Sequence, residues 1–365
     1  MGAADVVTTM TSAALALSVL DLVPVRTDQT TTDAVSAGLA LAQLADDLGY
    51  RRYWVAEHHN MPAVAATNPP VLMAMLAAAT RRIRVGSGGV MLPNHAPLVV
   101  AEQVALLEAA FPGRIDLGIG RAPGTDPVTS YALRHGAGGV SDEAVQHFPQ
   151  YVQDVLAMMA PEGVQVSVAG RTQPLRATPG ATSVADVWLL GSSDYSARLA
   201  AQLGLPYVFA HHFSGQGTLE ALELYRSSFR PSAHLDAPRT FLTVNAVVAE
   251  SSVEARRRAL PNQLMMLALR TGQPLGPQLL VEEAEKVELS PQQGEVLERM
   301  AQRWIVGDPA EAGQQLERLV ATYEVDEVMV HPVAGAHVGT EPGTAPARED
   351  TLRLLADWVS TAAMG

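Results

Sequence analysis

The sequence predicts an α/β fold, a (β/α)₈ barrel of the TIM type with two insertion loops. Short apolar segments alternate with helical ones along nearly the whole chain, an order typical of parallel strands joined by crossover helices. The chain has 365 residues, 48% of them hydrophobic, which is enough for one large core. Polar residues directly follow several of the strands. In such barrels the active site lies at the carboxyl ends of the strands, so these residues predict a site there.

Each predicted strand is a short apolar run. The first is nearly all apolar, as expected of a strand that is covered on both faces. The predicted strands span residues 14–22, 53–56, 83–90, 115–119, 187–190, 207–210, 241–248 and 327–331.

Helices are predicted between these strands, where apolar residues recur at helical spacing. A cluster of Thr and Asp at residues 30–33 supplies N-cap candidates for the first helix, and Gly49 ends it. Pro69 and Pro70 suit the first turn of the second helix. The predicted helices span residues 35–48, 71–80, 97–110, 148–159, 194–203, 218–229, 309–322 and 348–362.

Two segments interrupt the alternation. Residues 161–186 are rich in Gly, Pro, Thr and Ala and predict at most a small hairpin. Residues 262–303 are polar, partly helical and too long for an ordinary connection, so we expect a lid over the active face. Residues 1–12 have no periodicity and predict a flexible N-terminal arm, which leaves 13–365 as a single domain.

Composition excludes several functions. A net charge of −13 and a pI near 5.2 leave no broad basic surface, so no nucleic-acid partner is expected. The chain has no cysteine, which removes disulfides, thiolate nucleophiles, cysteine-bound zinc and iron–sulfur clusters. The apolar run 13–20 is shorter than the ~20 residues that span a membrane. We therefore expect a cytoplasmic protein without a membrane segment.

A candidate anion site lies at residues 191–199, GSSDYSARL, which follow one strand and begin a helix. Free backbone amides, the helix dipole and the hydroxyls of Ser192, Ser193 and Ser196 would suit a phosphate. A plain helix N-cap explains serine at this place equally well. Arg121, at the end of the fourth strand, could bind the phosphate in bidentate fashion or form a surface ion pair.

Two histidine pairs also follow strands: His58 with His59, and His211 with His212. They could be metal ligands, an acid/base pair or structural residues. Neighbouring residues of a strand point to opposite faces, so one pair cannot easily bind one metal, and no metal site is predicted. We expect His58 to face the barrel mouth and His59 to hold the loop. The glycine-rich run 86–89 either lets the backbone approach something large and flat or forms a bulge.

Together these runs resemble the bacterial luciferase-like flavin monooxygenases, especially their single-polypeptide members. The resemblance covers nearly the whole barrel, and its strength lies in the order and spacing of the runs. They are WVAEHHN, TRRIRVGSGGVMLPNHAPL, GRIDLGIGRAPGTD, WLLGSSDYSARLAAQLGLPYVFAHHF and WIVGDPAE. The resemblance implies a barrel, often dimeric, that takes reduced FMN from a separate NAD(P)H:flavin reductase and reacts it with dioxygen.

The resemblance also implies roles for individual residues. His58 matches a catalytic histidine near the reactive edge of the flavin, where it handles a proton. The peptide between Gly88 and Gly89 matches one that is commonly cis and packs on the isoalloxazine. The implied cofactor-binding residues are Gly88, Gly89, Glu102, Arg121, Gly191, Ser192, Ser193 and Ser196, and the implied substrate-pocket residues are His211, His212 and Trp304.

The reaction itself stays open among three functions. The first is a monooxygenase acting on an apolar organic substrate, with a secondary-metabolite intermediate expected by analogy. The second is a deazaflavin-dependent hydride transferase on the same barrel, and the third is a non-catalytic flavin-binding protein. Gly120 stands where luciferase has a cysteine near the flavin, which argues against light emission.

Overall fold

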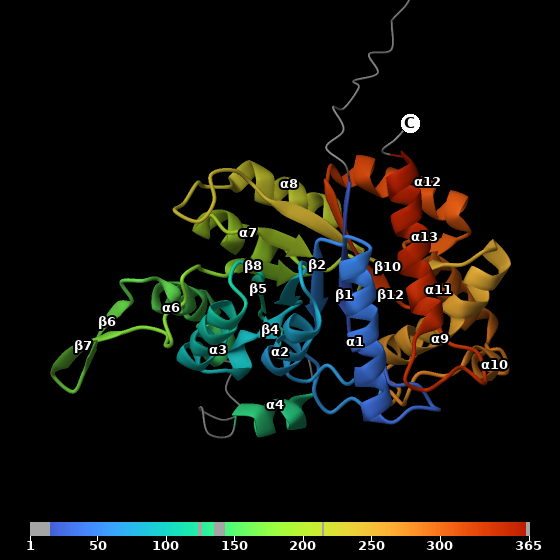
Figure 1. The fold of residues 1–365 in the computed structure, drawn as a ribbon, viewed down its shortest axis with the longest axis horizontal. Helices are drawn as coiled ribbons and strands as arrows, with labels where there is room; N and C mark the ends of the chain where they lie inside the picture. The colour runs from blue at the N-terminus through green and yellow to red at the C-terminus, as the bar shows by residue number, and fades with distance from the viewer. Residues whose placement is uncertain (1–14, 123–125, 135–142, 214, 363–365) are drawn as a thin grey trace, which may run out of the picture.

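The computed structural model describes residues 15–122, 126–134, 143–213 and 215–362 (Figure 1). The predicted arm, residues 1–12, lies outside these ranges. Parallel strands close into an eight-stranded barrel, because each strand pairs with the next and the last pairs with the first. The barrel strands are β1 (Ala16–Asp21), β2 (Arg52–Val55), β3 (Arg84–Ser87), β5 (Ile115–Gly120), β8 (Asp186–Gly191), β9 (Tyr207–Phe209), β10 (Thr240–Val248) and β12 (Glu327–Pro332). The predicted (β/α)₈ barrel is confirmed.

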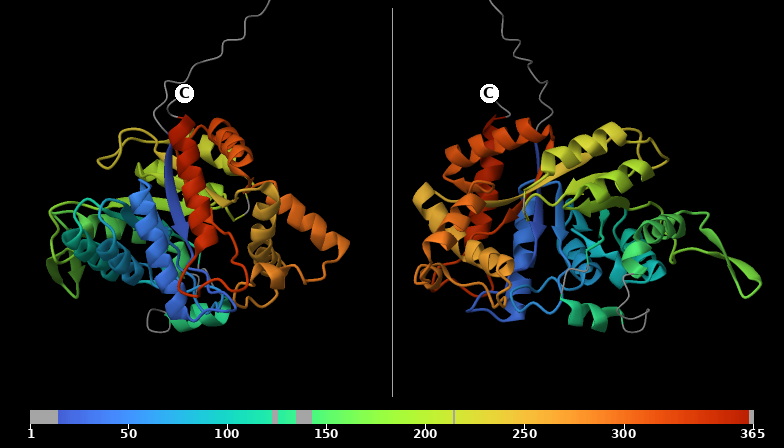
Figure 2. Two further views of the ribbon diagram at one scale, coloured as in Figure 1. Left: turned by 45° about the vertical axis from the view of Figure 1, so that its right-hand side comes forward. Right: turned by 180° about the vertical axis from the view of Figure 1, so that it is seen from behind.

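The predicted helices surround this barrel (Figures 1 and 2). The predicted N-cap cluster of the first helix is confirmed: Thr30 is the N-cap, and Thr30 and Asp33 form a capping box in which each side chain bonds to the other's backbone amide. Asn68 caps the second helix by accepting a bond from the amide of Val71. These helices are α1 (Thr31–Asp47), α2 (Pro69–Ala79), α3 (Pro97–Ala110), α6 (Phe148–Met159), α7 (Asp194–Leu203), α8 (Thr218–Ser228), α12 (Pro309–Tyr323) and α13 (Pro346–Ala362).

The predicted third strand, residues 83–90, is divided in two. β3 ends at Ser87, and a short strand β4 (Val90–Met91) pairs separately with β5. Between them the Gly88–Gly89 peptide is cis, as the resemblance implied. A side chain at Gly118 of β5 would lie 2.1 Å from the carbonyl oxygen of Ser87, so the two strands approach each other closely here.

The barrel interior is filled below its carboxyl-end mouth. Trp54 lies edge-on to Trp188 and to Phe241, with ring centroids 5.7 and 5.2 Å apart. At the amino ends of the strands, buried Arg52 pairs with Asp116 and Glu327, and its nitrogens lie 2.8 Å from each carboxylate. These rings and ion pairs form the floor above which the mouth opens.

The two insertions take different forms. β6 (Val164–Val168) and β7 (Arg171–Leu175) form the predicted hairpin, which extends away from the barrel (Figures 1 and 2). The second insertion is more regular than predicted, since α9 (Ser252–Arg270) already begins before residue 262. Pro261 lies inside this helix, and a proline there suggests a break when read from sequence alone. The remaining elements are η1 (Leu92–Asn94), α4 (Pro127–Arg134), α5 (Glu143–Gln146), α10 (Val281–Ala284), α11 (Pro291–Ala301) and β11 (Ile305–Gly307).

A histidine fastens the second insertion to the barrel. His337, in the loop after β12, contacts Glu282 of α10 through Nδ1 and Glu254 of α9 through Nε2, at 2.6 and 2.5 Å. Burial alone would lower the pKa of His337, but the hydrogen bonds and charges of both carboxylates outweigh it and raise that pKa. Within the described ranges, no helix is long and apolar enough to cross a bilayer.

Candidate active site

A cavity of ≈ 660 Å³ opens at the carboxyl-end mouth of the barrel. Its walls come from the loops after β2, β5 and β9 and from the end of α9 with the turn that follows. It is lined by His58, His59, Asn60, Met61, Pro62, Asp126, Phe213, Leu269, Gly272, Gln273, Pro274 and Leu275. The predicted first histidine pair and the predicted lid therefore meet at one cavity.

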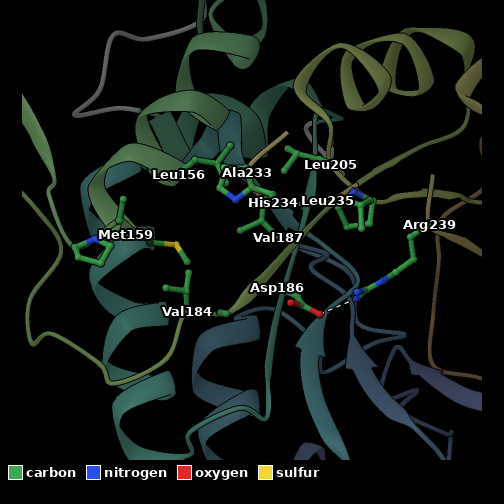
Figure 3. Close-up of a pocket in the computed structure, with 14 residues that line it drawn as sticks. Leu156, Met159, Val184, Asp186, Val187, Leu205, Ala233, His234, Leu235 and Arg239 are labelled. Atoms are coloured by element: carbon green, nitrogen blue, oxygen red, sulfur yellow. Dashed lines mark hydrogen bonds and ion pairs between the residues drawn. The ribbon is translucent and has the colours of Figure 1, made fainter. Parts of the chain in front are cut away.

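A second cavity, ≈ 350 Å³, lies at the opposite end of the barrel (Figure 3). Apolar residues such as Met159 and Leu235 line it, and Asp186 pairs with Arg239 across 2.7 Å at its edge. None of the predicted site residues lines this cavity. Because barrel enzymes carry their chemistry at the carboxyl ends of the strands, we take the mouth as the candidate active site.

Glu57 joins three residues at the mouth through hydrogen bonds. It is 1% exposed, and its Oε1 accepts hydrogen bonds from Nε2 of His59 and Nε2 of His95, both at 2.8 Å. Its Oε2 accepts a bond from the backbone amide of Met91 at 2.9 Å. Burial would raise the pKa of Glu57, but the bonds from His95, His59 and Met91 lower it overall, so the carboxylate stays ionised at neutral pH. Sequence reasoning placed this acid at a strand end without assigning it a role.

His58 is half-buried and differs from its neighbour. No described residue hydrogen-bonds to its buried Nδ1, whereas His59 is held by Glu57. Burial is the main cause that lowers the pKa of His58; His59 adds to the shift and Glu57 opposes it. At neutral pH His58 is therefore an uncharged imidazole at the cavity, able to accept a proton. The bond to Glu57 suits the expected loop-holding role of His59, but both histidines line the same cavity, so they do not point to opposite sides as expected.

The second histidine pair lies in the turn after β9, and its two side chains point to opposite sides of the barrel wall. His212 points inward, where its Nδ1 lies 2.9 Å from Oγ1 of Thr243 and its ring contacts the edge of His331. Burial, followed by repulsion from His211 and His58, lowers the pKa of His212 to about 4. His331 was missed by sequence reasoning, although it lies at the end of the last strand. Burial also lowers the pKa of His331, so the imidazoles of His212 and His331 are both uncharged at neutral pH.

Among the described residues that line the mouth cavity, His58 is the only predicted site residue. Three of the other predicted residues have contacts elsewhere in the fold. His211 points outward, with Nδ1 2.9 Å from Thr218 of α8 and its ring 5.2 Å from Tyr323 of α12. Trp304 is buried in a small core between β10 and α9. Glu102, on α3, accepts a hydrogen bond from Thr178 of the first insertion at 3.0 Å. His211, Trp304 and Glu102 therefore contact other parts of the fold and do not line the mouth cavity.

Arg121 lies beside the start of α7. Its guanidinium carbon is 4.0 Å from the centre of the Tyr195 ring, and Tyr195 belongs to the first turn of that helix. Among the described residues, no carboxylate pairs with Arg121. A cation at a helix N-terminus with no carboxylate partner in the described part of the chain favours an anionic ligand.

The serine turn is open to such a ligand. Ser193 occupies the N-cap position of α7, but its side chain makes no capping hydrogen bond, and Ser192 is also exposed. Ser196 is buried against Gly191, where a Cβ would lie 2.3 Å from the serine hydroxyl oxygen. Ser192 and Ser193 are therefore exposed at the N-terminus of the helix whose Tyr195 contacts Arg121, and the phosphate site stays a prediction.

The Gly88–Gly89 peptide presents bare backbone to the mouth. Both glycines are half-exposed although their neighbours Ser87 and Val90 are buried. A Cβ at Gly88 would lie 2.7 Å from Cδ1 of Leu20, and one at Gly89 would lie 2.7 Å from the carbonyl oxygen of Gly118. No larger residue fits at either position, so no side chain of these two residues would keep a planar ring away from the backbone. With Arg121, the serine turn and His58, this backbone is compatible with a flavin.

The fold and this mouth define a (β/α)₈-barrel protein with a site suited to a flavin, and comparisons with known proteins agree. The luciferase-like monooxygenase family matches residues 16–324. A luciferase-like monooxygenase of Escherichia coli (strain K12) is 40% identical over 322 residues, which are 88% of this chain and 92% of that protein. The chain belongs to the luciferase-like monooxygenase family, and is therefore a flavin-dependent monooxygenase.

Solved structures give the same result. Apo-MsnO8 matches with a TM-score of 0.79 and 32% identity, over 95% of this chain and 98% of that one. The oxygenating constituent of 3,6-diketocamphane monooxygenase from Pseudomonas putida, in complex with FMN, matches with a TM-score of 0.69. Its identity is 18%, over 95% of this chain and 98% of that one, so it shows the fold alone. The resemblance predicted from the sequence is confirmed.

Proposed function

We propose that this protein takes reduced FMN from a separate NAD(P)H:flavin reductase and inserts one oxygen atom of dioxygen into an apolar organic substrate. The observation that carries the proposal is the arrangement of three features around one mouth. They are an anion site at Arg121, a bare Gly88–Gly89 surface, and an uncharged His58 at a cavity. The cytoplasm is the compartment we expect, since reduced nicotinamide cofactors are made there.

Each feature has a role in holding the cofactor or the proton. Arg121 and the first amides of α7 would bind the phosphate by charge and hydrogen bonds. Gly88 and Gly89 would support the ring system because no side chain intervenes. Bound reduced FMN would supply the electrons with which dioxygen is activated.

His58 would accept and return a proton during oxygen transfer. Its lowered pKa keeps the imidazole free to accept a proton at neutral pH. Glu57 would assist without contacting the reacting atoms, because its charge stabilises the protonated imidazole and its bonds hold the adjoining loop.

Binding of FMN and of riboflavin, which lacks the phosphate, tests the anion site. Fluorescence titration should show that Arg121→Ala weakens FMN binding about 30-fold, or ~2 kcal/mol, the scale of a charge-assisted hydrogen bond. Riboflavin binding by the same variant should stay within twofold of wild type. Equal losses for both flavins would show that Arg121 does not bind the phosphate.

The same titration with the deazaflavin cofactor F420 separates the two oxidoreductase functions. We expect FMN to bind more tightly than F420. Oxygen consumption with NADH and a flavin reductase, run with a library of candidate substrates, then tests catalysis. Tight FMN binding without any substrate-dependent product would favour the non-catalytic flavin-binding protein.

We also propose a homodimer that pairs through α2 and α3. These neighbouring helices expose apolar side chains, namely Val71 and Met75 on α2 and Val99 and Leu106 on α3. Exposed apolar side chains grouped on neighbouring helices are typical of protein interfaces. Light scattering after gel filtration should show a dimer for the wild type and a monomer for Leu106→Asp. A wild-type monomer at micromolar concentration would contradict this interface.

A further inference from the structure

One wall of the mouth cavity is made of exposed apolar side chains. Phe213 follows β9, Leu269 lies at the end of α9, and Leu275 and Met61 complete the wall. Phe213 is 48% exposed and Leu269 is 36% exposed. Large apolar side chains that are exposed in one cavity favour the binding of an apolar ligand, because binding removes them from water.

Arg270 holds this wall together. It follows Leu269 directly, and its Nη2 donates a hydrogen bond to the carbonyl oxygen of Phe213 at 3.1 Å. The bond joins the end of α9 to the loop after β9, which are 57 residues apart in the sequence. Phe213 and Leu269 are therefore presented to the cavity as one unit, and Arg270 is not among the residues that line it.

Asp126 gives the cavity a negative charge. Its carboxylate caps α4 by accepting bonds from the amides of Val128 and Thr129 and from the Thr129 hydroxyl. The bonds to Thr129 are the main cause that lowers the pKa of Asp126 to about 2, so it is ionised at neutral pH. None of the described residues that line the cavity is a lysine or an arginine, and neither residues 123–125 nor residue 214 is charged in the sequence.

We propose that the substrate is an uncharged, largely apolar molecule bound in this cavity, where Phe213 and Leu269 select it by size and Asp126 repels anions. The inference rests on the proposed oxygenation, because the substrate must lie beside His58, which lines the same cavity. A volume of ≈ 660 Å³ lies within the range of cavities that bind small organic molecules.

Two dyes with one skeleton test the charge preference. N-phenyl-1-naphthylamine is uncharged, and 8-anilino-1-naphthalenesulfonate adds only a sulfonate to the same rings. Fluorescence titration of the full-length protein should show at least tenfold tighter binding of the uncharged dye. Asp126→Asn, which can still cap α4, should strengthen binding of the sulfonate at least threefold and leave the uncharged dye unchanged. Equal affinity of wild type for both dyes would overturn the charge selection.

Matched truncations test the position of the site. Phe213→Ala and Leu269→Ala should each weaken binding of the uncharged dye about five- to tenfold, as expected when apolar contact area is lost. Leu235→Ala, in the cavity at the other end of the barrel, is the control and should have no effect. Weakening by Leu235→Ala and not by Phe213→Ala would place the dye in the other cavity and overturn the proposal.

Flavin titration of the same proteins separates this inference from the proposed function. Phe213→Ala and Leu269→Ala should bind FMN within twofold of wild type, because neither lies at the phosphate turn or the glycine surface. If wild type fails to bind FMN, the proposed function fails whatever the dyes do. If FMN binds and the two truncations leave dye affinity unchanged, the inference alone fails.

Discussion

Replacing Glu57 with glutamine would test whether one buried carboxylate holds the mouth together. The glutamine oxygen can still accept from His59 and His95, but its NH₂ group then faces the amide of Met91. A buried donor left without an acceptor costs ~1–3 kcal/mol. The two histidine bonds also lose their charge assistance, at roughly 0.5–1 kcal/mol each. We therefore expect Glu57→Gln to lower the free energy of unfolding by about 3 kcal/mol.

Thermal unfolding measures this loss. For a chain of 365 residues a loss of about 3 kcal/mol corresponds to a fall of roughly 4 °C in the thermal midpoint. Glu102→Gln is the matched control, because Glu102 accepts one described side-chain bond, from Thr178, and is less buried. Its midpoint should change by no more than about 2 °C. A midpoint for Glu57→Gln within 2 °C of wild type would refute the role of Glu57 in holding the mouth.

A second measurement separates electrostatics from packing. The charge of Glu57 raises the pKa of His58, against the larger effect of burial. Glu57→Gln should therefore lower the pKa of His58 further, which NMR titration of the His58 ring carbon-bound protons can follow. An unchanged pKa for His58 would show that the carboxylate acts on the loop alone.

Further predictions concern three histidines. His58→Ala should keep FMN binding within twofold yet lower single-turnover product formation by about 100-fold, the scale of a general acid/base group; full product formation would leave His58 as packing. His59→Ala should instead lower the thermal midpoint, because Glu57 loses a partner. The pKa of His337 is raised, so the stability that His337 contributes is fully present below its unfolded pKa near 6.5 and disappears as pH rises through the folded pKa. The gap in thermal midpoint between wild type and His337→Asn should therefore be larger at pH 6 than at pH 9, and a constant gap would contradict the charged link to Glu254 and Glu282.

Local sequence patterns predicted the barrel because each strand and helix depends mainly on its own residues. Apolar runs and capping residues such as Thr30 and Asn68 mark elements without reference to the rest of the chain. Errors arose where a local pattern could be read in two ways. The run 83–90 was predicted as one strand but is divided at the Gly88–Gly89 peptide, and the irregular stretch predicted from residue 262 is in part the helix α9.

The parts of the site that are contiguous in sequence could also be predicted. The turn at 191–196 and Arg121 follow strands directly, so their place at the mouth follows from the fold class alone. The contacts of Glu57 with His95 and Met91 could not be predicted, because they join residues 38 and 34 positions apart across neighbouring strands. Which member of each histidine pair points inward likewise depends on where the strand actually ends.

The sequence by itself determined the order of elements, the family, and the end of the barrel at which the site lies, since these follow from local periodicity and short motifs. The tertiary structure alone decided which side chains share the cavity. Phe213 and Leu269 form one wall only because barrel closure and the path of α9 bring them together, and no local pattern marks either residue. Which side chains meet across a closed barrel depends on strand register and packing. Both depend on contacts between residues far apart in the sequence, so a short stretch of sequence does not determine them.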